Sequence, residues 1–414
     1  MSTPACIIVD AYRFSKIYTA LAHTKNMQCI HVQSTPQKLY KISTFDPKDY
    51  IANFIFDNNF EKLIAQLAEF NIQAVIPGTE PSVLLADLLA SRFNVPRNSY
   101  EKSAARRDKY LMIEALRENH VPHVQDIKTT DYATALEWVT ANTQWPVVAK
   151  PLSSAFSDNV FICDSANILK DAFDKIQHSK NRFGGENAEV LVEFFLQGTE
   201  YVVDTVSCEG KHYISDIWQC HKTFTDDHRI IYDTEELLPF AGLAQQTLTN
   251  YVQQVLNALE IRYGASHAEI MLTSDGPILI EIGARVGGHV WPQVHKQCLG
   301  YNQIELMIDS YLDPQSFFAR TREHYQLTQH ALLVILASTQ TGIIKSIPLI
   351  EKIQRLPSFA DMIMAVKIGD KLEITQDLAS SPGKVILAHH DPVVIRNDYA
   401  AIKKAEKSGF ILKS

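Results

Sequence analysis

Two glutamates, Glu269 and Glu281, lie on the two arms of a predicted β-hairpin, residues 268–282, with the sequence AEIMLTSDGPILIEI. The run Ser274-Asp275-Gly276 suits a three-residue loop with glycine in the left-handed position, which sets Glu269 opposite Glu281. Facing like charges destabilise a strand pair, whereas a hard cation held by both carboxylates removes the repulsion. Oxygen-only ligation suits Mg²⁺, with a nucleotide supplying further oxygens, so the pair predicts a magnesium–nucleotide site. The alternative is two solvated glutamates on an exposed face.

Cationic residues near the hairpin and upstream of it suit phosphate chemistry. Arg285 follows the second glutamate by four residues and precedes Gly287 and Gly288. A fixed guanidinium beside a metal can stabilise charge on a transferring phosphoryl group, and glycines let backbone N–H groups approach a ligand closely. Lys150 ends the apolar segment WPVVAK before a proline, where a lysine is poorly solvated unless it meets an anion such as phosphate. Lys109, in the first turn of a predicted helix, has the position of an ordinary surface lysine.

The first 98 residues alternate predicted strands with helices. Apolar runs typical of strands cover residues 6–10, 28–32 and 73–78, and residues 60–70 have helical spacing. This alternation predicts a parallel sheet covered on both faces. Sites in such sheets lie beyond the carboxyl ends of the strands, here residues 10–15 and 78–80. No G-x-G-x-x-G follows the first strand, which disfavours a nicotinamide-binding Rossmann domain.

The rest of the chain mixes strands and helices without this alternation. We expect helices over residues 109–118, with Asp108 as N-cap, and near 166–177 and 243–260. Strands are expected over residues 145–152 and 189–196. After about residue 325 the pattern changes to short strands and a last helix near residues 398–406.

Composition excludes several classes of protein. The 414 residues contain 39 Lys and Arg against 47 Asp and Glu, a net charge of -8, so the basic footprint of a general nucleic-acid binder is absent. The six cysteines form no C-x-x-C pair, which disfavours zinc ribbons and a disulfide scaffold. No apolar run reaches the roughly 18 residues that a spanning helix needs, and the start has no pattern of a signal peptide. We therefore expect a cytoplasmic protein without nucleic-acid or membrane partners.

Six segments in order resemble the ATP-grasp superfamily, specifically its L-amino-acid ligases. They are PGTEPSVLLADLLA, ARRDKYLMIEAL, VVAKPLSSAFSDNVFIC, LVEFFLQGTEYVVD, SHAEIMLTSDGPILIEIGARVGG and SPGKVILAHHDPVVI. The resemblance implies an α/β and α+β protein with three parts: an N-terminal parallel-sheet (pre-ATP-grasp) domain over residues 1–98, an ATP-grasp clamp over 99–324 with a mobile lid at about 125–197, and a small C-terminal α+β lobe over 325–414.

The resemblance also implies roles for site residues. ATP phosphates would be held by Lys109 and Lys150, with the hydroxyls of Ser154 and Ser157. The adenine would contact Glu193, Phe194 and Leu196, and the ribose would contact Glu200. Glu269 and Glu281 would bind Mg²⁺, with Mn²⁺ as an alternative. Arg285 and the Gly288 amide would stabilise the reacting species, and the substrate would lie near His267, Gly287 and His289, with His289 lining the first amino acid's pocket.

Two features depart from the family pattern. The phosphate-covering loop is usually rich in glycine, whereas residues 153–159 read SSAFSDN. Many members carry asparagine two residues after the second metal glutamate, where this chain has Gly283. That difference puts one ligand of a second Mg²⁺ in doubt. For His267 the alternative is a structural histidine, and no histidine spacing supports a four-ligand transition-metal site.

The activity that the resemblance implies is ATP-dependent formation of a dipeptide from two L-amino acids, through an acyl-phosphate, with release of ADP and phosphate. Its partners would be small molecules, the amino acid substrates. The sequence leaves the oligomeric state open, with a homodimer as one outcome. Two alternatives stay open: another ATP-grasp carboxylate–amine ligase or a carboxylase with non-amino-acid substrates, and a nucleotide-binding regulatory protein without turnover. The presence of Arg285 favours an enzyme, because a protein that only binds a nucleotide has little need of it.

Overall fold

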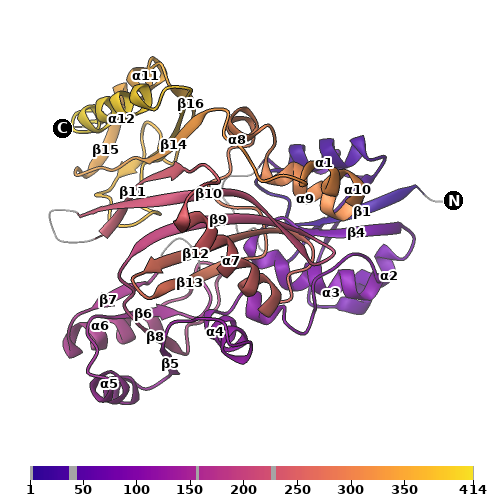
Figure 1. Cartoon of the computed structure of the whole chain (residues 1–414), viewed down its shortest axis with the longest axis horizontal. Helices are drawn as coiled ribbons and strands as arrows, with labels where there is room; N and C mark the ends of the chain where they lie inside the picture. Colours follow the sequence, from indigo (N-terminus) through magenta and orange to yellow (C-terminus); the bar gives the residue numbers. More distant parts are fainter. Residues whose placement is uncertain (1–2, 37–43, 155–157, 225–229, 414) are drawn as a thin grey trace.

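A computed structural model describes residues 3–36, 44–154, 158–224 and 230–413 of the chain (Figure 1). Its N-terminal sheet contains β1 (Pro4–Val9), β2 (Gln28–Gln33), β3 (Ala52–Ile55) and β4 (Asn71–Pro77), in the order β3-β2-β1-β4. All three strand pairs are parallel, which confirms the predicted parallel sheet. The helices of this segment are α1 (Ser15–Thr24), α2 (Phe60–Leu67) and α3 (Val83–Phe93). The short strand β3, which has no continuous apolar run, was not predicted.

A second four-stranded sheet, at the lower left of Figure 1, carries two helices. It has the order β5-β8-β6-β7, with β5 (Asp126–Thr129), β6 (Val147–Pro151), β7 (Phe161–Cys163) and β8 (Val190–Phe194). The helices are α5 (Tyr132–Ala141) and α6 (Ala166–Gln177), and they share one apolar core with the sheet. Helix α4 (Lys109–Glu118) precedes the sheet and begins where we predicted, because the Asp108 carboxylate accepts a hydrogen bond from the Leu111 amide.

The largest sheet has eight strands in the order β13-β12-β9-β10-β11-β14-β18-β16. Five come from the central segment: β9 (Thr199–Cys208), β10 (Lys211–Phe224), β11 (Ile230–Leu237), β12 (Gly264–Thr273) and β13 (Gly276–Gly283). Three come from beyond residue 325: β14 (His330–Ile335), β16 (Phe359–Met364) and β18 (Gly383–His389). The sheet thus continues across residue 324, where the clamp was predicted to end. The three-part division of the chain stays a prediction.

The remaining elements surround this sheet. Helix α7 (Leu243–Ala258) packs its apolar side chains against β12 and β13 in the main core. The others are α8 (Pro292–Leu299), α9 (Gln303–Leu312), α10 (Pro314–Arg320), α11 (Pro348–Gln354), α12 (Pro392–Glu406), β15 (Gly342–Ser346), β17 (Lys371–Leu372) and β19 (Ile411–Leu412). Helix α12 begins six residues before the predicted start, because Asp391 caps it and Pro392 fits the first helical position. Within the described residues, none of the helices combines the length and apolar character that crossing a bilayer requires.

The β12–β13 hairpin differs from its prediction in the loop. Thr273 pairs with Gly276, so the loop has two residues, Ser274 and Asp275, instead of three. A register shift after Glu269 adds one residue on β13, and this bulge restores the expected pairing of Glu269 with Glu281. The predicted pair is therefore confirmed, although through a different loop.

One face of the large sheet carries several of the polar side chains that the sequence singled out. Facing residues in antiparallel strands lie on the same face, and alternate residues along a strand do so too. Strand pairing carries this relation from β13 to β18. The pairs are Glu281 with Glu269, His267 with Asp204, Asp204 with Asp216, Cys220 with Glu235, Glu235 with Leu333, Leu333 with Ile386 and Ile335 with Lys384. We call this surface the active face. It is defined by Glu200, Asp204, Glu235, His267, Glu269, Glu281 and Lys384.

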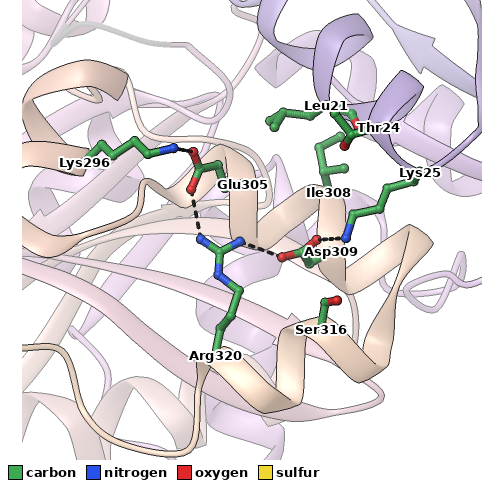
Figure 2. Close-up of a pocket in the computed structure, with 9 residues that line it drawn as sticks. All are labelled: Leu21, Thr24, Lys25, Lys296, Glu305, Ile308, Asp309, Ser316 and Arg320. Carbon is green, nitrogen blue, oxygen red and sulfur yellow. Dashed lines mark hydrogen bonds and ion pairs between the residues drawn. The ribbon is translucent and has the colours of Figure 1, made fainter.

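An ion-pair network joins the N-terminal segment to the central one (Figure 2). Lys25, just beyond α1, lies 2.7 Å from carboxylate oxygens of both Asp309 and Asp313. Arg320 contacts Asp309 at 2.7 Å and Glu305 at 2.9 Å. The network and the surrounding side chains line a pocket between α1, α9 and α10. Because α1 also packs against α9, the N-terminal sheet is fixed to the large sheet at this point.

Candidate active site

The two glutamates of the hairpin share their environment with a lysine from α4. The Nζ atom of Lys109 lies 2.6 Å from Oε2 of Glu281, and the side chains of Glu269 and Glu281 are 28% and 26% exposed. Burial would lower the pKa of Lys109, but the charge and hydrogen bond of Glu281 outweigh it and raise that pKa above its usual value. The structure therefore brings to the glutamates a lysine whose sequence position alone suggested an ordinary surface residue.

Arg285 is held by a residue that follows the parallel sheet. Its Nε atom lies 2.9 Å from Oε2 of Glu80, and Arg107 contacts the other oxygen of Glu80 at 3.5 Å. Glu80 belongs to residues 78–80, which topology marked as a site because they follow the carboxyl end of β4. A β-carbon at Gly283 would lie 2.6 Å from Oε2 of Glu80 and 3.0 Å from Cζ of Arg285. A side chain at position 283 would therefore displace the Glu80–Arg285 pair.

Lys150 and Glu193 form a second buried pair, between neighbouring strands β6 and β8. Their Nζ and Oε2 atoms are 2.7 Å apart, and burial raises the pKa of Glu193 even though Lys150 opposes this. The Phe194 ring lies against Trp138, and the Phe194 amide donates to the Gln125 carbonyl at 3.1 Å. Leu196 follows β8 and packs in the small core around Ile113 and Leu191.

Glu200 is also held by its neighbours. Its carboxylate lies 2.5 Å from Nζ of Lys222 and accepts a hydrogen bond of 2.6 Å from the Tyr232 hydroxyl. In the loop after β6, Ser154 donates to Asp158 at 2.7 Å, and its carbonyl accepts a hydrogen bond from Lys109 at 3.4 Å. Ser157 and Phe156 lie outside the described residues. The nucleotide roles of these residues stay predictions.

A buried acid–histidine cluster occupies the middle of the active face. Asp204 accepts hydrogen bonds from His267 at 2.8 Å and from His289 at 3.0 Å, and the other ring nitrogen of His289 lies 2.9 Å from Glu235. Burial would lower the pKa of His289, but Asp204 and Glu235 outweigh it and raise that pKa to about 10. Both ring nitrogens of His289 are therefore engaged, and its role in a substrate pocket stays a prediction.

Gly287 lies against this cluster at a distance that only glycine permits. A β-carbon there would be 2.8 Å from Oδ2 of Asp204 and 3.0 Å from Nδ1 of His267. The Gly287 amide donates to Gln303 at 3.0 Å, which fixes the turn over the sheet. His267, Gly287 and His289 are thus brought together as predicted neighbours, whereas Asp204 and Glu235 were missed. A charged residue inside the apolar strand YVVDTV was the available signal for Asp204.

Three-residue metal-ligand groupings also occur here, although the sequence spacing argued against a transition metal. Asp204, His267 and His289 offer ligand atoms within 4.8 Å of one another, and so do Asp216, His289 and His295. In the first group these atoms already hydrogen-bond to one another. In the second, burial lowers the pKa of His295 to about 4. We interpret both groups as buried hydrogen-bonded clusters.

Replacing His289 with glutamine is expected to lower the free energy of unfolding by about 3–5 kcal/mol near neutral pH, because Asp204 and Glu235 lose the cation between them. The contribution of His289 is complete below the unfolded histidine pKa of about 6.5 and is lost as the pH rises through its folded pKa of about 10. Urea unfolding at several pH values should therefore show the gap between wild type and variant narrowing over this range. The exposed His390→Gln is the control, and a gap independent of pH would contradict a charged His289.

Comparisons with known proteins identify the family of the chain. The ATP-grasp domain family matches residues 143–293. The chain is 34% identical to dapdiamide A synthase from Enterobacter agglomerans, over 97% of this chain and 95% of that protein. An L-amino acid ligase from Bacillus licheniformis has the same fold, with a TM-score of 0.78 at 18% identity and all of both chains covered. A carboxyaminoimidazole ribonucleotide synthase from Aspergillus clavatus, complexed with ATP, gives a TM-score of 0.70 at 13% identity over 98% of each chain. The chain belongs to the ATP-grasp ligases, among those that join a carboxylate to an amine.

Proposed function

We propose that this ligase forms a dipeptide from two L-amino acids. The observation that carries the proposal is the placement of Glu269 and Glu281 opposite each other, with Lys109 beside one of them and Arg285 held by Glu80. This arrangement suits attack at the γ-phosphate of ATP. The likeness to dapdiamide A synthase over nearly the whole chain supports amino-acid-like substrates.

The reaction begins at the carboxylate of the first amino acid. A carboxylate oxygen attacks the γ-phosphorus, the bond to the β-phosphate oxygen breaks, and ADP leaves. Lys109 and Lys150 would neutralise phosphate oxygens, and Arg285 would stabilise the charge that develops on the transferred group. The product is an acyl-phosphate, which the closed site protects from water.

The second half forms the peptide bond. The ammonium group of the second amino acid loses a proton to water, and its nitrogen attacks the acyl carbon. The bond from that carbon to the phosphate oxygen breaks, and the leaving phosphate takes up the second proton from the nitrogen. The Gly288 amide would donate to the oxyanion of the tetrahedral species. Because both substrates are held beside each other, most of the rate gain comes from orientation and charge neutralisation.

The described residues fit a divalent cation between the two glutamates. Both carboxylates are partly exposed, and Lys109 occupies only one oxygen of Glu281. Glu269 and Glu281 would hold Mg²⁺, or Mn²⁺, which when bound neutralises phosphate charge and makes the γ-phosphorus more electrophilic. Carboxylate oxygens are the ligands that such hard cations prefer.

Turnover is expected to yield ADP and phosphate and no AMP, because the cationic groups gather where attack at the γ-phosphate would occur. The measurement is nucleotide and phosphate analysis with ATP, Mg²⁺ and pairs of the twenty amino acids, with mass detection of products. A dipeptide formed in equal amount to ADP supports the proposal. If ADP forms only when other carboxylates or amines are supplied, the substrates are not amino acids. If AMP forms in equal amount to the product, the acyl-phosphate route is excluded. The homodimer also stays a prediction, and light scattering would measure the mass of the protein in solution.

A further inference from the structure

Two cationic side chains from opposite ends of the sequence lie on or beside the active face. Arg13 lies in the turn between β1 and α1, and its guanidinium donates a hydrogen bond to the Gly288 carbonyl. Lys384 is the second residue of β18, more than 370 positions later in the chain. Neither residue is among those expected to hold the ATP phosphates, which are Lys109 and Lys150.

The side chain of Lys384 points onto the active face because of the strand register. Glu235 pairs with Leu333, and Leu333 pairs with Ile386, which is two residues from Lys384 on the same strand. Lys384 is half-buried in this position. Among the residues that the structure describes, its ammonium group has no hydrogen bond and no ion pair with a carboxylate. A half-buried ammonium without a partner is costly unless it meets an anion.

Nearby charges locate the Lys384 ammonium relative to the rest of the site. Burial lowers the pKa of Lys384, the carboxylates of Glu235 and Glu269 oppose this effect, and the positive charge of Arg13 adds to it. Glu235 is already bonded to His289, so its charge is shared. The like charges of Arg13 and Lys384 therefore act on each other, and an anion bound by both side chains would relieve this repulsion.

The chemistry of the reaction identifies the anion that would lie there. This step rests on the proposed dipeptide synthesis. The carboxylate of the first amino acid is consumed in the acyl-phosphate, whereas the α-carboxylate of the second amino acid stays charged from entry to product. The nitrogen of the second amino acid must reach the carbon beside the Gly288 amide, and its carboxylate is two bonds further from that carbon. Arg13, which touches Gly288, lies at a suitable place.

We propose that Arg13 and Lys384 bind the α-carboxylate of the amino acid that supplies the amine. Arg13 contributes a fixed guanidinium charge that suits a carboxylate, and Lys384 contributes a compact second charge. The two residues fix the orientation of the amine donor and exclude amines that lack a carboxylate. Neither takes part in phosphoryl transfer.

The test compares amine donors that differ only in the carboxylate. For Lys384→Met and Arg13→Gln, the KM for the amine-donating amino acid is expected to rise about 10- to 100-fold, the range expected for the loss of a charge-assisted hydrogen bond. The KM values for ATP and for the acyl donor should stay within twofold. The corresponding amino-acid amide should be a poor donor for the wild type and lose little further in either variant. Lys384→Arg should restore much of the affinity, and the exposed Lys345→Met is the matched control.

Equilibrium binding separates this inference from the proposed function. Calorimetry with ADP, Mg²⁺ and the free amino acids measures binding without turnover, and amino-acid binding should weaken in Lys384→Met. If the wild type makes no dipeptide but this loss of binding occurs, the dipeptide assignment fails and the carboxylate site stands. If the wild type makes dipeptide while both variants keep its preference for free amino acids over amides, the carboxylate site is wrong. A wild type that binds no amino acid in any state overturns both.

Discussion

Arg285→Met is expected to lower kcat by about 10³-fold, equivalent to about 4 kcal/mol of transition-state stabilisation. The guanidinium is held by Glu80 at 2.9 Å, so it is fixed before the phosphoryl group moves. Groups positioned in this way act mainly on the transition state, so the KM for ATP should change little. Arg285→Lys keeps the charge but loses the planar fork, and an intermediate kcat is expected.

The control for Arg285 is Arg322→Met, which removes an exposed arginine outside the site. Both variants are compared with the wild type by steady-state kinetics and by their unfolding midpoints, because Arg285→Met also leaves Glu80 with Arg107 alone. A variant that folds normally and keeps wild-type kcat would show that Arg285 is an ordinary arginine before a glycine turn.

Glu281→Gln is expected to reduce turnover at least 100-fold and to raise the Mg²⁺ concentration needed for half-maximal rate. The change removes one of two facing carboxylates and the ion-pair partner of Lys109, whose Nζ lies 2.6 Å from Glu281. A neutral amide is a weaker ligand for a hard cation, and Lys109 is then free to take another position. The measurement is a Mg²⁺ titration of phosphate release at saturating ATP.

Asp275→Asn provides the matched control, because it removes an exposed carboxylate from the loop of the same hairpin. It should leave the Mg²⁺ titration unchanged. Normal turnover of Glu281→Gln at saturating Mg²⁺ would return this residue to the other interpretation of the sequence, a solvated glutamate on an exposed face.

Local patterns predicted the elements that depend on nearby residues. The parallel N-terminal sheet followed from alternating strands and helices, and the start of α4 followed from the Asp108 cap. The pairing of Glu269 with Glu281 was also predictable, although the bulge that produces it was not. In each case, the residues that determine the element are close in sequence or alternate along one strand.

Contacts between distant segments could not be predicted in this way. Lys109 reaches Glu281 across 172 positions, and nothing in the first turn of a helix indicates such a partner. The addition of β14, β18 and β16 to the large sheet depends on strand pairing between segments far apart in the sequence. His289 looked available to a substrate because its partners, Asp204 and Glu235, lie 85 and 54 positions earlier. The resemblance to ATP-grasp ligases predicted the order of the segments along the chain. It did not predict which side chains contact one another.

The close approach of Gly283 to Glu80 has a consequence for how the sequence can change over evolutionary time. An added β-carbon at position 283 would fall 2.6 Å from the Glu80 carboxylate, so a larger residue there would require the Glu80 side chain to move. A substitution at 283 would therefore disturb the ion pair between Glu80 and Arg285. Positions 80, 283 and 285 are coupled in this way, although they are divided between the loop after β4 and the end of the β12–β13 hairpin. Exchange of the N-terminal segment between related enzymes would separate these coupled positions.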